Sequence, residues 1–245
     1  MAEAPETPQL DTYRPARAMV IVAHPDDADF GPAATLAGWI AAGTVARLVC
    51  CTSGDAGSDD PNTDPLALAR LREQEQRAAA AVVGYEEVTF LHRPDGALEN
   101  DLALREQLVT LIREFRPDTV VTMDPTMVFS IHGRVQHTDH RAAAMAAVDA
   151  VYPAARNAMA FQHLAKGGLA PHKVKWLYLT WTDKPNVWVD TTATIDRKID
   201  ALKAHASQMR DPWDTFQARM REHEADEGRR IGTAYAEAFR RLDVE

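Results

Sequence analysis

Two short segments of this 245-residue sequence combine imidazole and carboxylate side chains at spacings that suit metal-assisted chemistry. The first, "AHPDD", places His24 just ahead of two adjacent carboxylates, Asp26 and Asp27. Pro25 disfavours the α conformation for the residue before it, so the chain should stay extended through His24 and turn after it. We therefore expect His24 and Asp27 to point at a common centre.

The second segment, "HTDH", places His137 and His140 three residues apart at an expected helix start. That spacing puts both rings on one face of the helix. Two imidazoles and one carboxylate, from His24, Asp27 and His140, leave a coordination position for water, which is the form of catalytic zinc. Mg²⁺ and Ca²⁺ prefer oxygen shells, whereas Fe²⁺ also accepts two histidines and one carboxylate. We expect Zn²⁺, with Fe²⁺ as the alternative.

The other polar groups of these segments have natural roles in hydrolysis beside such an ion. Asp26, next to Asp27, is placed to take a proton from the attacking water as general base and to give it to the leaving nitrogen. His137, if protonated, is placed to stabilise a developing oxyanion. Asp139 either orients His137 or faces the helix macrodipole as an acidic residue of the first turn.

Taken alone, each segment also has an ordinary structural reading. "HPDD" suits a turn with capping aspartates, and an isolated pair of histidines is commonly a surface or core feature. Their joint occurrence after two expected strands favours the metal site.

The elements that must position these residues alternate between short apolar runs and helical patterns. This alternation predicts an α/β fold with three layers, a largely parallel sheet with helices on both faces in a Rossmann-like arrangement. Expected strands cover 18–23, 45–51, 86–91, 118–123, 173–181 and 186–190, and expected helices cover 33–43, 66–84, 101–115, 141–155, 194–205 and the tail from Trp213 onward.

We expect residues 1–17 to form a flexible N-terminal arm and 18–245 to form a single domain. In open parallel sheets, ligands bind at the carboxyl ends of the strands. The loops that should meet at that edge are 24–29, 52–65, 92–100 and 124–137.

Composition excludes several classes of protein. With 36 acidic and 27 basic residues the net charge is −9, which argues against nonspecific nucleic-acid binding, and no basic amphipathic stretch suggests a membrane surface. The start lacks the pattern of a secretory signal, and Cys50 and Cys51 are expected to be buried thiols, so the cytoplasm is the expected compartment. The first strand is followed by "HPDD" and not by a glycine-rich turn, which argues against a nucleotide-binding Rossmann protein.

The aromatic residues and the tail leave alternatives open. Trp176, Trp181 and Trp188 are expected as core or interface aromatics, with a sugar-stacking surface as the alternative. The Arg-rich tail is either a solvated helix or a contact in a homo-oligomer. His205 lies either at the pocket rim or on a helix surface, and the loop 126–136 has no assigned role.

Both segments resemble the motifs of the LmbE-like, or PIG-L, family of zinc-dependent de-N-acetylases. Further segments agree with that family, namely "TSGDAGS" (52–58), the spacing from Arg72 to Glu75, "RPDG" (93–96), "RPDTVVTMDP" (116–125) and "KIDALKAHASQ" (198–208). The resemblance covers roughly residues 18–210. The chain departs from the family at Thr138, where many members have proline, and at Ala28, where several have glutamate.

The resemblance implies specific roles for the residues at matching positions. It implies His24, Asp27 and His140 as zinc ligands, Asp26 as general base and acid, and His137 as the group that stabilises the tetrahedral intermediate. It also implies substrate-binding roles for Asp55, Arg72 and Asp95. For Arg72 a solvated helix charge is the alternative, and for Asp95 a turn residue before a glycine.

The expected function is that of a zinc-dependent hydrolase. It removes the N-acetyl group of an N-acetylglucosamine-type substrate and releases acetate and a free amine. The alternatives are an amidase acting on a larger thiol–sugar conjugate of the mycothiol type and a non-catalytic, metal-containing binding protein of the same fold. The expected partner is a small N-acylated amino sugar, with neither nucleic acid nor membrane.

Overall fold

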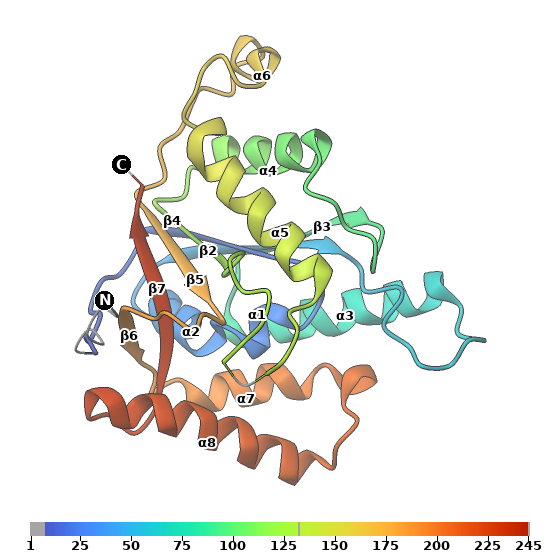
Figure 1. The fold of residues 1–245 in the computed structure, drawn as a ribbon, viewed down its shortest axis with the longest axis vertical. Helices are drawn as coiled ribbons and strands as arrows, with labels where there is room; N and C mark the ends of the chain where they lie inside the picture. The colour runs from blue at the N-terminus through green and yellow to red at the C-terminus, as the bar shows by residue number, and fades with distance from the viewer. Residues whose placement is uncertain (1–7, 132, 245) are drawn as a thin grey trace.

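The computed structural model describes residues 8–131 and 133–244, which are built around one seven-stranded sheet (Figure 1). The strands are β1 (Arg17–Val22), β2 (Val45–Thr52), β3 (Glu87–Arg93), β4 (Thr119–Met123), β5 (Trp176–Thr180), β6 (Val187–Asp190) and β7 (Ala236–Asp243). Their order is β3-β2-β1-β4-β5-β7-β6. The first five pair in parallel, and β7 runs antiparallel to both of its neighbours. The predicted largely parallel sheet is confirmed.

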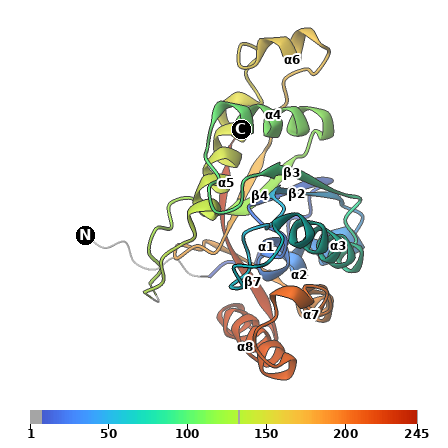
Figure 2. The ribbon, with the colours of Figure 1, turned by 90° about the vertical axis from the view of Figure 1, so that its right-hand side faces the viewer.

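Helices cover both faces of this sheet, as predicted. They are α1 (Asp27–Phe30), α2 (Ala33–Ala41), α3 (Pro65–Val83), α4 (Leu102–Phe115), α5 (Thr138–Asp149), α6 (Gln162–Lys166), α7 (Ile195–Lys203) and α8 (Trp213–Ile231), with a π-helical turn at Ala150–Ala154 and a 3₁₀ turn at Ala206–Gln208. Figures 1 and 2 show α4 and α5 on one face, α1, α2, α3 and α7 on the other, and α8 beyond α7. None of the described helices has the length and apolar composition needed to cross a bilayer.

Local sequence signals explain where these elements begin and end. The Asp101 side chain caps α4 by accepting a hydrogen bond from the Leu104 N–H at 2.6 Å. Gly84 ends α3 with a φ of 105°, a conformation that costs little without a Cβ. Strand β1 is buried along almost its whole length, as a central parallel strand covered on both faces should be. Cys50 and Cys51 are buried free thiols, as predicted.

The C-terminal tail corrects the sequence prediction. A helix was expected from Trp213 onward, but α8 ends at Ile231 and the chain returns as strand β7. Gly232 adopts a φ of 76° and terminates the helix. The returning segment lies between β5 and β6, which pair with it and not with each other. Its backbone pairs with the hydrogen-bonding groups of both strands. This pairing joins residues far apart in the chain, so the local helical pattern does not reveal it.

The N-terminal arm is docked where the structure describes it. The Gln9 carbonyl accepts a hydrogen bond from the Trp188 N–H at 2.8 Å, and the Asp11 N–H donates to the Trp188 carbonyl at 2.7 Å. The carboxylate of Asp11, which is 5% exposed, accepts a hydrogen bond from the Tyr178 hydroxyl at 2.6 Å. Residues 8–16 of the expected flexible arm are therefore held against β6 and β5, and residues 1–7 lie outside the described residues.

Candidate metal centre and active site

The two predicted motifs meet at the carboxyl edge of β1 and β4. These strands are neighbours, and they flank the point where the order of the parallel strands changes direction. In open α/β sheets this switch point is where ligands bind. The segment after β1 carries His24 and continues into α1 at Asp27, and the segment after β4 leads to His137, the residue that caps α5.

The three predicted ligands contact one another. Asp27 presents one carboxylate oxygen to each imidazole: its Oδ2 lies 3.5 Å from His24 Nδ1, and its Oδ1 lies 3.1 Å from His140 Nε2. Burial by itself raises the pKa of Asp27, but the neighbouring His140 and His24 outweigh it and hold the pKa well below its usual range. The Asp27 carboxylate is therefore an anion at neutral pH.

The second nitrogen of His24 is held by two further carboxylates. His24 Nε2 lies 2.9 Å from Asp95 Oδ1 and 3.3 Å from Asp139 Oδ2. Burial lowers the pKa of His24, but the hydrogen bonds to Asp27 and Asp95 outweigh burial and raise it to about 11. Without a metal this ring carries a proton on each nitrogen, so an ion that binds it must displace one of them.

Asp139 contacts His24 rather than the ring edge of His137. Its carboxylate is fully buried and also accepts a hydrogen bond from the Gly96 N–H at 2.7 Å. The predicted link between Asp139 and His137 runs instead through the backbone: the Asp139 N–H donates to His137 Nδ1 at 3.1 Å. Asp139 thus orients His24 through its carboxylate and His137 through its amide.

The surroundings of His137 favour a neutral ring, whereas the sequence made its oxyanion role conditional on a protonated one. Partial desolvation, followed by the neighbouring His24 and His140, lowers the pKa of His137. Because its Nδ1 accepts the Asp139 N–H, the single proton of the neutral ring is on Nε2. His137 can therefore donate a hydrogen bond from Nε2 without being charged.

Among the described residues, two groups of three side chains, neither of which includes Asp27, bring donor atoms close enough together to hold a metal ion. One group consists of His24, His137 and His140, and a second of His24, Asp95 and Asp139; within each group the donor atoms lie within 4.8 Å of one another. His140 Nδ1 is buried and has no hydrogen-bond partner among the described residues. A mixed imidazole and carboxylate set suits Zn²⁺ or Fe²⁺ better than Mg²⁺ or Ca²⁺.

Asp26 stands beside this cluster in an unusual backbone conformation. Its φ is 94°, which costs a residue with a side chain about 1–3 kcal/mol and persists where the surroundings enforce it. Burial and the charge of Asp27 raise the pKa of Asp26 to about 7, against the opposing effect of Arg72. A carboxyl with this pKa exchanges a proton near neutrality, as a general base and acid must.

Arg72 contacts Asp26 and links the loop after β1 to the loop after β2. Its guanidinium is 4% exposed and donates to the carbonyls of Pro25 at 2.7 Å and Gly54 at 3.1 Å. Its Nη2 also lies 3.2 Å from Asp26 Oδ2. Gly54 has a φ of 69°, and a Cβ there would collide with the guanidinium. Of the residues predicted to bind substrate, Arg72 holds the Asp26 carboxylate, Asp95 contacts His24, and Asp55 is half-buried beside Gly54.

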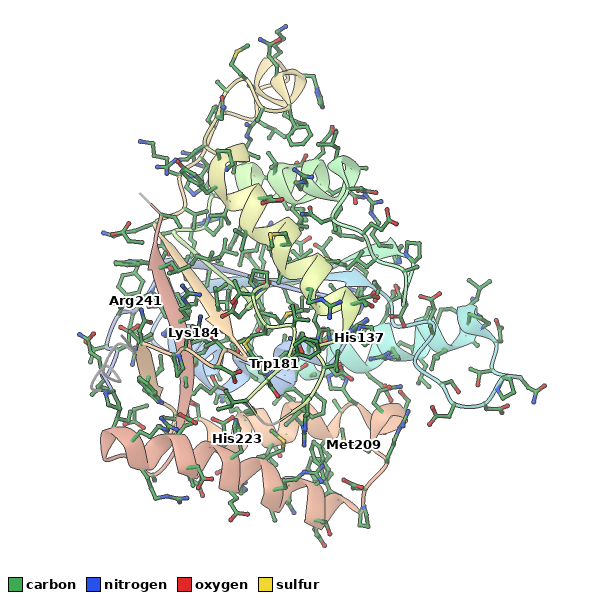
Figure 3. All side chains as sticks on the ribbon, viewed as in Figure 1. His137, Trp181, Lys184, Met209, His223 and Arg241 are labelled. Carbon is green, nitrogen blue, oxygen red and sulfur yellow. The ribbon has the colours of Figure 1, made fainter. Side chains whose placement is uncertain are left out.

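Sequence reasoning favoured a core or interface role for Trp181 and kept a sugar-stacking surface as the alternative, and the structure places Trp181 beside the histidines. The residue follows β5 with a φ of 54°, and its ring centroid lies 5.1 Å from that of His140. Figure 3 shows Trp181 and His137 near the lower end of α5. The signal that could have found it is its place directly after a strand of the same sheet edge. The loop before His137 is held to the segment that follows Trp181, because the Ile131 N–H donates a hydrogen bond to Asp183 Oδ2 at 2.8 Å.

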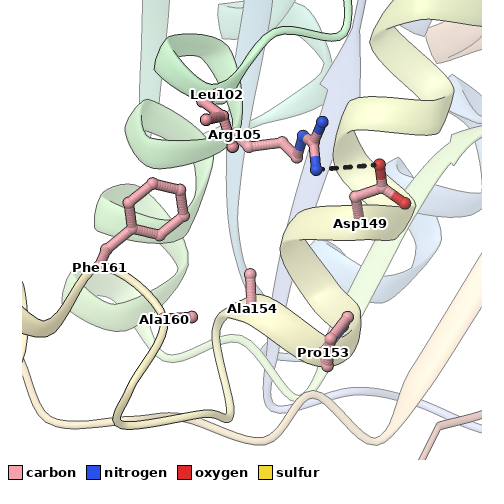
Figure 4. Close-up of a pocket in the computed structure, with 7 residues that line it drawn as sticks. All are labelled: Leu102, Arg105, Asp149, Pro153, Ala154, Ala160 and Phe161. Atoms are coloured by element: carbon pink, nitrogen blue, oxygen red, sulfur yellow. Dashed lines mark ion pairs between the residues drawn. The ribbon is translucent and has the colours of Figure 1, made fainter.

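A hollow of about 370 Å³ lies elsewhere, at the far end of α5 (Figure 4). Its lining residues are Leu102, Arg105, Asp149, Pro153, Ala154, Ala160 and Phe161. Arg105 Nη1 lies 3.7 Å from Asp149 Oδ2 across it. This hollow shares no residue with the histidine cluster.

Comparison with known proteins supports the same chemistry. Residues 19–151 match the family model described as PIG-L: GlcNAc-PI de-N-acetylase. The diacetylchitobiose deacetylase of Thermococcus kodakarensis is 28% identical over 225 residues, a match that covers 91% of this chain and 82% of that protein. The 1D-myo-inositol 2-acetamido-2-deoxy-alpha-D-glucopyranoside deacetylase of Kineococcus radiotolerans is 27% identical, with 85% of this chain and 72% of that protein covered.

A solved structure extends the likeness to the fold. The N,N'-diacetylchitobiose deacetylase from Pyrococcus horikoshii, in complex with an inhibitor, superimposes with a TM-score of 0.85 at 27% sequence identity. The superposition covers 94% of this chain and 84% of that one. The likeness therefore extends well past the matched family segment.

Proposed function

This chain belongs to the PIG-L family of GlcNAc-PI de-N-acetylases, and from that premise we propose that it is a zinc-dependent N-deacetylase. Its substrate is an N-acetylglucosamine-type amino sugar, and its products are acetate and the free amine. The observation that carries the proposal is the meeting of His24, Asp27 and His140 with Asp26 at one sheet edge. The names of the related proteins, which are deacetylases of diacetylchitobiose and of a GlcNAc-inositol, support the substrate class.

His24, Asp27 and His140 would hold the ion. A zinc ion held there would lower the pKa of a water molecule to about 7 and would polarise a carbonyl oxygen. Asp26 accepts a proton from the water that attacks the acetamide carbon, and a new C–O bond forms. His137 donates a hydrogen bond from its Nε2–H to the acetamide carbonyl oxygen, which becomes negatively charged as the water attacks. Asp26 then gives its proton to the amide nitrogen as the C–N bond breaks, so that one carboxyl serves both steps.

Several carboxylates and a guanidinium keep these groups in place. Arg72 holds the Asp26 carboxylate and the backbone before it. Asp139 and Asp95 fix the His24 ring through Nε2, so that Nδ1 faces Asp27. Such outer partners determine the orientation and basicity of a metal-binding imidazole. The buried free thiols Cys50 and Cys51 suit a reducing compartment, and we place the protein in the cytoplasm on that ground.

The experiment that tests this function measures acetate release by the purified protein. We expect release from N,N'-diacetylchitobiose or from a GlcNAc glycoside. Removing the metal with a chelator should abolish it, and adding back Zn²⁺ or Fe²⁺ in parallel samples should identify the ion that restores it. Hydrolysis of thiol–sugar conjugates alone would favour the amidase. A fully metal-loaded protein that hydrolyses none of these amides would favour the binding protein and contradict the proposal.

A further inference from the structure

Gln76 lies on the face of α3 that is turned toward Asp26, one helical turn after Arg72. Its side chain is fully buried and bridges Asp26, which carries the proton in the proposed mechanism, and Asp29. Gln76 Oε1 accepts a hydrogen bond from the backbone N–H of Asp26 at 2.7 Å, and its Nε2 donates to Asp29 Oδ2 at 2.7 Å. The mechanism above assigns Gln76 and Asp29 no role.

The Asp29 carboxylate determines which way the Gln76 amide faces. A carboxylate only accepts hydrogen bonds, so the NH₂ group of Gln76 must point at Asp29 and its carbonyl oxygen at the Asp26 N–H. His205 Nε2 lies 2.9 Å from the same Asp29 oxygen and donates to it. Asp29 and His205 are both fully buried. If the amide turned over, two N–H groups would face each other at Asp26.

His205 reaches this position because α3 also fixes the turn that follows α7. Glu75 accepts hydrogen bonds from the Ser207 N–H at 2.8 Å and from the Ser207 hydroxyl at 2.6 Å. Ser207 is two residues after His205, so the Glu75 contact holds the segment that carries the imidazole. Two adjacent residues of α3 therefore hold this hydrogen-bonded chain. Gln76 binds Asp26 and Asp29, and Glu75 binds the segment that carries His205.

Asp26 is a residue for which such support matters. Its φ of 94° is a conformation that a residue with a side chain adopts only when its surroundings enforce it. The Gln76 contact fixes the backbone amide of Asp26, and the Arg72 contact fixes its carboxylate. With both ends of the residue held, the direction of the carboxylate is set before any substrate arrives.

We propose that Gln76, oriented by Asp29 and His205, positions Asp26 for proton transfer. Gln76 and His205 are positioning residues, because they act through the backbone of Asp26. This proposal rests on the proposed function, in which Asp26 carries the proton. It accounts for the burial of His205, which the sequence left between a rim position and a helix surface.

The test replaces Gln76 with methionine, which has a similar shape and cannot bond to the Asp26 amide. The Q76M variant should keep its metal content and KM within about twofold, whereas kcat should fall about tenfold to a hundredfold. Hydrogen exchange at the Asp26 backbone amide, read from the peptide that contains it or by NMR, should become faster. The matched control is Q217M on α8, where Gln217 donates a hydrogen bond to the nearby Asp214 among the described residues, and it should match the wild type in every measurement.

A second pair of variants tests the other end of the arrangement. H205F removes the donor to Asp29 and should lower kcat as Q76M does, whereas H205Q places an amide N–H at a similar reach and should restore most of it. This pair also decides the question if Q76M does not fold. An unchanged kcat in Q76M, a loss of kcat that follows loss of metal, or an H205Q variant as impaired as H205F would each overturn the proposal.

The exchange measurement separates this proposal from the function on which it rests. A wild-type protein that releases no acetate would contradict the proposed function, while faster exchange at Asp26 in Q76M would still show that Gln76 holds this amide. An active wild type with the same exchange rate and kcat in Q76M would leave the function intact and refute the positioning role.

Discussion

Replacing Asp26 with asparagine is the most direct test of the proposed chemistry. Asparagine has the shape of aspartate and adopts positive φ more readily than most residues, so it can occupy the φ of 94°. Its side-chain oxygen can still accept the hydrogen bond from Arg72 that Asp26 Oδ2 now accepts at 3.2 Å. The proposed ligands His24, Asp27 and His140 are untouched. The substitution therefore removes the proton carrier and little else.

The expected loss follows from the two steps that this one carboxyl serves. General acid–base catalysis contributes about 10²–10⁴-fold, so D26N should lower kcat about 10³-fold, equivalent to about 4 kcal/mol in the barrier. Metal content should stay at the wild-type level. The assay is acetate release per bound metal ion, with D59N as the control because Asp59 is highly exposed and, among the described residues, forms an exposed ion pair with Arg210. A D26N variant that loses metal but keeps its turnover per ion would refute the role of Asp26.

Three further substitutions test the neighbouring groups. H137A should lower kcat about 10²-fold or more with metal content unchanged, because it removes one donor to the oxyanion; an equal loss of metal would instead make His137 a ligand. D139N should weaken metal binding about 10–100-fold in a chelator competition, since Asp139 holds His24; unchanged affinity would contradict that link. Burial raises the pKa of Glu224 to about 8 despite its ion pair with Lys198, so the folded protein keeps a proton that the unfolded chain loses above about 4.5. The free energy of unfolding should thus fall as the pH rises from about 5 to about 9, and E224Q should make that fall smaller in urea titrations; parallel pH profiles would refute this.

The sequence predicted the layered fold well, because its strands and helices follow short-range patterns. The apolar run of β1, the Asp101 cap of α4 and the glycine after α3 are read from neighbouring residues. The helix predicted from Trp213 onward is present only as far as Ile231, since β7 owes its conformation to two strands that precede it in the chain by some fifty residues. A segment with a helical pattern forms a strand instead when the neighbouring strands would otherwise leave buried backbone groups unpaired.

The candidate site shows the same division. The types and spacing of His24, Asp27 and His140 indicated a metal site, because the donor chemistry is a property of the residues themselves. Only the folded chain shows that Asp139 contacts His24 and that Gln76 binds the Asp26 amide across 50 positions of sequence.

The sequence by itself thus indicated the longer helices, every strand except β7, and the donor types that gather at the carboxyl edge of the sheet. A few neighbouring residues are enough to set the local sterics, the hydrophobic period and the type of side-chain donor. Tertiary structure decided which carboxylate serves which imidazole and how Asp26 is held. Those outcomes depend on contacts between residues up to 176 positions apart, such as His205 and Asp29, and on the burial that shifts their proton affinities.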